Sequence, residues 1–123
     1  MDQHIFKHFQ KLIEATMVVG DAFSAPMIKA TEKITSALLA GNTIFSCGDR
    51  AAVLLAELFT DYLALGFEIE RPGFPALNIN RLADNSFGAE RYADCLQVHG
   101  QSADILLVVS SGDNSLSLIS TVE

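Results

Sequence analysis

Apolar residues recur at every third or fourth position near the start of the chain, a spacing that predicts amphipathic helices. The first stripe predicts a helix over residues 3–19, which Gly20 should end. Ser24 is placed to cap a second helix with Pro26 in its first turn, and Gly41 supplies a C-terminal stop. We therefore expect two leading helices. The stripe of the first consists of Ile5, Phe6, Phe9, Leu12, Ile13 and Met17.

Shorter apolar runs after residue 40 predict three buried strands, over residues 43–47, 76–79 and 104–110. Strands that alternate with helices form right-handed βαβ units around a parallel sheet. We expect a single three-layer α/β domain, with a helical leader over residues 1–40 and a βαβαβα core over 41–123. The helices of the core are expected over residues 50–66, 87–98 and from 115 onward.

The strand over residues 104–110 is the most apolar of the three, so we expect it at the centre of the sheet, paired on both edges. Only three strands are available, so either another chain covers its free edge or the chain is a shortened version of a larger fold. The apolar stripe over residues 3–19 also has no obvious second surface to cover. Both features predict that the chain forms a homo-oligomer, either a dimer or a tetramer.

Composition narrows the class of protein. A chain of 123 residues suits one domain, and 50% hydrophobic residues exclude a disordered chain. The formal net charge of −7 disfavours direct binding to nucleic acid or to an anionic membrane. No apolar run approaches the length of a membrane span, and the first residues lack the pattern of a secretory signal. We expect a cytoplasmic protein.

The residues that most often bind metals are scattered. Cys47 and Cys95 lie far apart in the sequence, and we interpret them as reduced thiols in the core rather than as a disulfide or a metal site. The three histidines form no recognisable metal motif. The sequence therefore predicts neither a metal nor a cofactor.

The segment after the third predicted strand carries the most suggestive chemistry. Ligands of open α/β sheets bind beyond the carboxyl ends of the strands. Residues 110–115 offer three hydroxyls, a side-chain amide and a glycine where a helix should begin. The hydroxyls and the free N–H groups of a helix N-terminus could donate hydrogen bonds to a phosphate. A simple capped turn, with Asp113 or Asn114 as the N-cap, explains the same residues, and the spacing alone favours that reading.

Two other patterns are weaker. Residues 48–52 follow the first predicted strand but contain one glycine, and Arg50 there could bind an anion or simply lie exposed. Glu57 and Asp61 are four residues apart on a predicted helix, so they could share a proton or a metal. A solvated helix face is the favoured interpretation of this pair.

Three segments, over residues 38–48, 70–76 and 104–115, resemble the SIS (sugar isomerase) domain. The sequences of these segments are most similar to the branch of the family that contains phosphoheptose isomerases and DnaA initiator-associating proteins. The resemblance implies a parallel sheet of SIS-like, flavodoxin-like type. The resemblance covers nearly the whole chain, but it corresponds to only about the first two thirds of the family's domain. The sheet of that domain normally has five strands.

The resemblance also implies where a phosphosugar would bind and which catalytic groups are missing. The histidine that binds zinc in the isomerases falls at Leu58, and their acid for proton transfer falls at Tyr62. Their second catalytic histidine lies beyond the matched part, so no catalytic residue is expected here. The implied phosphosugar-binding residues are Gly48, Ala52, Ser110, Ser111, Asn114 and Ser115.

The resemblance favours a non-catalytic SIS-like domain that associates with a bacterial replication initiator and regulates replication initiation. A sugar phosphate is a candidate ligand. One alternative is an enzyme, a sedoheptulose 7-phosphate isomerase (phosphoheptose isomerase) of lipopolysaccharide heptose synthesis. Another is a sugar-phosphate sensor that binds its ligand without turning it over. The sequence leaves these alternatives open.

Overall fold

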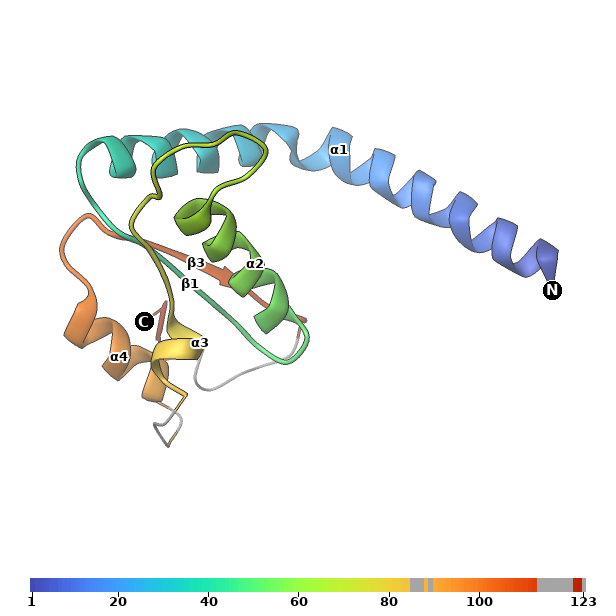
Figure 1. Ribbon diagram of the computed structural model, residues 1–123. Helices are drawn as coiled ribbons and strands as arrows, with labels where there is room; N and C mark the ends of the chain where they lie inside the picture. The colour runs from blue at the N-terminus through green and yellow to red at the C-terminus, as the bar shows by residue number, and fades with distance from the viewer. Residues whose placement is uncertain (85–87, 89, 113–120, 123) are drawn as a thin grey trace. The chain divides into compact units, whose positions relative to one another are not determined.

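The computed structural model describes residues 1–84, 88, 90–112 and 121–122 (Figure 1). The chain divides into two compact units, Met1–Lys33 and Ile34–Glu123. The predicted helix from residue 115 lies outside the described residues. The elements are α1 (Asp2–Leu39), β1 (Ile44–Gly48), α2 (Ala52–Leu65), β2 (Ala76–Asn78), α3 (Ile79–Leu82), α4 (Arg91–His99) and β3 (Ile105–Val109).

The leading segment is one helix, so the prediction of two was wrong. Gly20 lies within α1, because a single glycine costs a helix only about 1 kcal/mol relative to alanine. Pro26 also lies inside the helix. The Ser24 hydroxyl donates to the Gly20 carbonyl one turn back instead of capping a new helix. Good helix formers on both sides of these residues outweigh the two local breakers.

The sheet has three parallel strands in the order β2–β1–β3. The prediction that residues 104–110 form the central strand was wrong, because β1 occupies that place. All five residues of β1 are buried, whereas those of β3 are only partly buried. Among the described strands, β3 pairs with β1 alone. The two neighbours of β1 explain why it is the better buried strand.

Two apolar clusters cover opposite faces of the sheet, which confirms the predicted three-layer α/β fold. On one face, Phe45 and Cys47 of β1 pack with residues of α3 and α4. On the other face, Ile44 packs with residues of α2 and of the end of α1. The alternation along β1 follows from the two-residue period of a strand. None of the helices in the described part of the chain is long and apolar enough to span a membrane.

The ends of the other elements differ from prediction by a few residues. The second strand stops at Asn78, because the Asn78 side chain accepts a hydrogen bond from the Arg81 amide at 3.0 Å and caps α3. Ile79, predicted to end that strand, is buried at the start of α3. The predicted helix over residues 87–98 appears as α4, which begins at Arg91.

The end of β1 packs so closely that only glycine fits. A Cβ atom on Gly48 would lie 2.6 Å from the carbonyl oxygen of Ala52 and 3.0 Å from that of Val109. Both are backbone atoms and cannot turn away as a side chain could. The close approach holds the first turn of α2 against the carboxyl ends of β1 and β3.

We predict that Gly48→Ala lowers the free energy of unfolding by about 1–3 kcal/mol, because the new methyl group overlaps backbone atoms. Gly20→Ala is the matched control, since nothing lies within 4 Å of that position and alanine favours a helix. Urea unfolding followed by circular dichroism measures both. Equal stability of the Gly48→Ala variant and the wild type would contradict the close packing.

Candidate functional site

The loops that follow β1 and β3 meet at one edge of the sheet. Gly48 is aligned with Val109 in the parallel register, so the residues after each strand are neighbours. The Asp49 amide donates to the Val109 carbonyl at 3.4 Å. Of the six residues assigned to phosphosugar binding, the structure therefore brings Gly48 and Ala52 next to the segment that begins with Ser110 and Ser111. The other two, Asn114 and Ser115, lie outside the described residues.

The carboxylate of Asp49 takes up the donors of this segment. Its Oδ1 atom accepts from the Ser111 amide at 2.8 Å and from the Ser111 hydroxyl at 3.0 Å. Its Oδ2 atom accepts from the Ser110 hydroxyl at 3.2 Å. Asp49 is 9% exposed, whereas both serines are exposed. The groups predicted to bind a phosphate thus bind a side chain of the same molecule.

This arrangement was missed by the sequence analysis, although a signal for it existed. The carboxyl ends of parallel strands lie at the same edge of a sheet, so Asp49 and Ser110 had to be close once their strands were paired. That another element could bring a negative charge to the predicted phosphate site was not considered in the sequence analysis. The structure shows that Asp49 brings one.

Hydrogen bonding and burial change the acidity of the groups around this edge. The hydrogen bond from the Ser111 amide is the main reason that the pKa of Asp49 is lowered; partial burial opposes it, and the two serine hydroxyls add to it. Burial is the larger cause, and the charge of Asp49 the smaller one, that together raise the pKa of the Cys47 thiol to about 11. Cys47 is therefore a protonated, unreactive thiol at neutral pH, as expected for a core cysteine.

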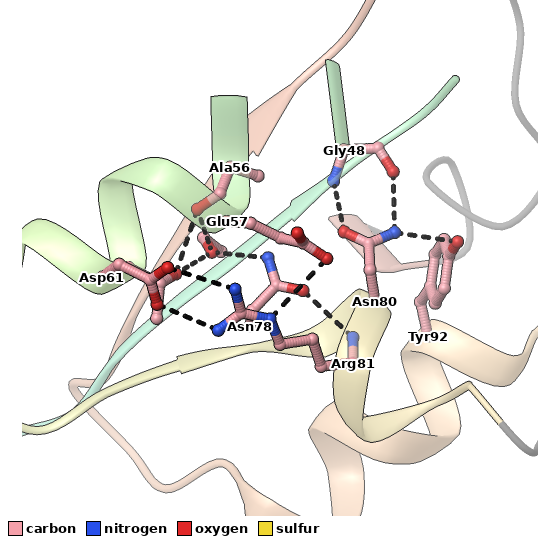
Figure 2. Close-up of polar contacts among 10 residues, drawn as sticks. Gly48, Ala56, Glu57, Asp61, Asn78, Asn80, Arg81 and Tyr92 are labelled. Carbon is pink, nitrogen blue, oxygen red and sulfur yellow. Dashed lines mark hydrogen bonds and ion pairs between the residues drawn. The ribbon is translucent and has the colours of Figure 1, made fainter. Parts of the chain in front are cut away.

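A side chain of α3 supports β1 where β2 has ended. Asn80 Oδ1 accepts from the Gly48 amide at 2.9 Å, and Asn80 Nδ2 donates to the Gly48 carbonyl at 2.9 Å (Figure 2). The same Nδ2 atom donates to the Tyr92 hydroxyl at 2.9 Å. The side-chain amide of Asn80 thereby satisfies the hydrogen bonding of both the N–H and the C=O group of Gly48, as the backbone of a neighbouring strand would.

The two carboxylates of α2 are held by an arginine that the sequence analysis did not identify. Arg81 makes a bidentate contact with Asp61, at 2.9 Å to Oδ1 and 3.2 Å to Oδ2 (Figure 2). Its Nε atom lies 3.7 Å from Glu57. The hydrogen bond to Arg81 is the first cause of the lowered pKa of Asp61. Both carboxylates therefore face a cation rather than a shared proton.

Glu57 and Arg81 border a cavity of about 360 Å³ that is lined by residues of α2, α3 and α4. Its lining is mixed in charge and includes Arg81, Arg91, Glu57 and Asp84. The Tyr92 hydroxyl, at 3.2 Å from an Arg91 nitrogen, completes the polar lining. The mixture balances positive and negative groups and does not select one class of ligand.

The two residues that the resemblance matched to the isomerase histidine and acid, Leu58 and Tyr62, are an apolar and an aromatic side chain on α2. Leu58 is 46% exposed on α2, and Tyr62 is 41% exposed with its ring centroid 4.5 Å from that of Phe67. Within the residues that the structure describes, no group of three or more histidine, cysteine, aspartate or glutamate side chains could hold a metal ion.

Comparisons with known proteins agree on one family. No family model matches the chain. It is 30% identical to the DnaA initiator-associating protein DiaA of Photorhabdus laumondii over 122 residues, covering 94% of this chain and 62% of that protein. It is 31% identical to the phosphoheptose isomerase of Shewanella piezotolerans over 130 residues, covering 100% of this chain and 66% of that protein. The chain thus spans a little under two thirds of the length of these relatives.

Solved structures give the same answer for the fold. A phosphoheptose isomerase from Francisella tularensis matches with a TM-score of 0.86 at 27% identity, covering 98% of this chain and 66% of that one. The phosphoheptose isomerase GmhA from Neisseria gonorrhoeae matches with a TM-score of 0.82 over the same shares, at 19% identity. The second match bears on the fold alone.

The lowered pKa of Asp49 leads to a prediction about stability in acid. The ionised carboxylate stabilises the folded state above the unfolded pKa of about 3.9, and this contribution is lost as the pH falls through the lower folded pKa. The gap in unfolding free energy between the wild type and Asp49→Asn should be constant from about pH 7 to pH 5 and should shrink below about pH 4. Urea titrations at several pH values measure it.

Asp94→Asn is the matched control for this series, because Asp94 is exposed on α4 and the substitution removes the same charge. Its gap to the wild type reports the effect of the lost charge that the two substitutions share. A gap for Asp49→Asn that persists undiminished to about pH 3 would contradict the assignment.

Proposed function

We propose that this chain is a non-catalytic protein that binds the replication initiator DnaA. It belongs to the SIS (sugar isomerase) family of phosphoheptose isomerases and DnaA initiator-associating proteins, and the proposal rests on that membership. Such a protein regulates replication initiation in the bacterial cytoplasm through contact with another protein rather than with DNA. The net charge of −7 fits that distinction, since a DNA-binding surface is usually basic.

The observation that carries the proposal is the state of the groups on α2. Isomerisation of an aldose to a ketose moves a proton between adjacent carbons and needs a positioned base and acid. Leu58 and Tyr62, at the positions matched to the isomerase histidine and acid, offer neither an imidazole nor a carboxylate. The nearby carboxylate of Asp61 is bound by Arg81, which lowers its pKa and makes it a weak base.

A second candidate function is sedoheptulose 7-phosphate isomerisation. Its support is the likeness to isomerases, at 31% identity to the Shewanella piezotolerans enzyme and a TM-score of 0.86 to the Francisella tularensis structure. In that case other residues would transfer the proton, and Asp61→Ala or Ser111→Ala should abolish turnover. The two functions are therefore separable by experiment.

We also propose that the chain forms a homo-oligomer through its first unit. The apolar stripe of α1 is more than half exposed along its length, which is unusual for so many large side chains on one helix face. Because the stripe runs along an amphipathic helix, a second copy of the same helix would cover it with matching spacing. The exposed fractions range from 52% to 69% across Ile5, Phe6, Phe9, Leu12, Ile13 and Met17.

The first test measures DnaA binding and turnover on the same preparation. The immobilised chain should retain purified DnaA of the same organism, and the free chain should not isomerise sedoheptulose 7-phosphate. Retention of a control bacterial DNA-binding protein would show that capture is unspecific and would count against the proposal. Turnover that Asp61→Ala abolishes, without DnaA binding, would replace the proposal with the isomerase function.

The second test concerns the oligomer. Light scattering at about 50 µM should give a mass of at least twice the 13.3 kDa of one chain. Phe9→Asp should shift the protein toward the monomer, because it places a charge on the apolar stripe, whereas Gln10→Asp next to it should not. A wild-type monomer at this concentration would contradict the proposed oligomer.

A further inference from the structure

Three hydrogen-bond donors converge on one point at the edge of the sheet. They come from two consecutive residues, the backbone amide and hydroxyl of Ser111 and the hydroxyl of Ser110. The Gly112 amide donates to the Ser110 hydroxyl oxygen at 3.2 Å. That contact uses an acceptor site of the Ser110 oxygen and leaves its proton directed at Asp49.

A backbone amide flanked by two hydroxyls is a suitable recognition site for an oxyanion. Such donors stabilise negative oxygen atoms, and a carboxylate and a phosphate make the same demand on them. In this chain the two oxygens of Asp49 take all three hydrogen bonds, one oxygen facing Ser111 and the other facing Ser110. The side chain therefore lies where an external oxyanion would bind.

We propose that Ser110 and Ser111 form an oxyanion-binding site that Asp49 occupies as an internal ligand, so that the chain as it stands excludes phosphate from this site. Two effects act together. The Asp49 carboxylate uses the donors that a phosphate would need, and its negative charge repels a phosphate that approaches them. Because Asp49 itself is buried, it cannot be shielded by solvent as an exposed carboxylate would be.

The proposal does not depend on DnaA binding. It bears instead on the predicted phosphosugar site, since it states that Ser110 and Ser111 have the necessary groups and that Asp49 keeps them occupied. It also assigns to Asp49 the role of deciding which class of ligand this edge of the sheet accepts.

The test compares inorganic phosphate binding by the wild type and by Asp49→Ala, which removes the internal ligand. Isothermal titration and the rise in melting temperature with added phosphate measure the affinity. The wild type should show no saturable binding at millimolar phosphate. Asp49→Ala should bind phosphate at least about tenfold more tightly, and adding Ser111→Ala to it should remove this gain.

Two controls separate the site from general charge effects. Asp94→Ala lowers the negative charge of the whole chain equally, and it should gain no phosphate binding. Asp49→Asn removes the charge but keeps an oxygen that accepts from Ser111, so its gain should be smaller than that of Asp49→Ala. A gain of this size also serves as the test if Asp49→Ala does not fold. Circular dichroism checks folding of every variant.

Each outcome decides the question. Phosphate binding by the wild type as tight as that of Asp49→Ala, or a shift of the wild-type Ser111 amide signal in a nuclear magnetic resonance titration, would overturn the proposal. So would a folded Asp49→Ala variant that binds no phosphate, because the serines would then not form an oxyanion site. A gain that Ser111→Ala leaves intact would place the phosphate elsewhere and would also overturn it.

Discussion

The parallel pairing of β1 with a neighbour on each side is the constraint on which the rest of the second unit depends. A strand enclosed on both edges and both faces must have every polar group satisfied, because no water reaches it. Ser46, in the middle of β1, contacts the Ala56 carbonyl and the Thr60 hydroxyl of α2 and accepts from Asn78 of β2. These contacts join a strand, a helix and a second strand through one buried hydroxyl.

Local pattern predicted the elements of this fold better than it predicted their arrangement. The alternation of strands and helices was sufficient for a parallel three-layer sheet, because few topologies satisfy it. It could not give the strand order, because the most apolar strand, β3, lies at the edge of the described sheet and is less buried than β1. Gly20 and Pro26 misled the prediction of α1, because breaker residues weigh heavily in a local pattern while the helix forms over its whole length.

In the candidate site, too, the residues of one segment were predicted from the sequence, whereas their partners from distant segments were not. The serines at residues 110 and 111 were identified from their own sequence, but their partner Asp49 is 61 or 62 residues away. Arg81 and Asn80 were also missed, because each binds a residue of a different element. Asn80 of α3 binds Gly48 of β1, and Arg81 of α3 binds Asp61 of α2. The comparisons establish the family, and the side chains at this edge determine what chemistry a member of that family can perform.

The support of Gly48 by Asn80 has a consequence for which substitutions the chain tolerates. An aspartate has nearly the same size and shape as asparagine, yet it offers two acceptors and no donor. It would turn an oxygen toward the Gly48 carbonyl, which can only accept, and the Tyr92 hydroxyl would have to donate rather than accept to keep its contact. At this position an exchange that conserves volume is therefore a radical one, and similarity of shape is a poor guide to which sequences can adopt the fold.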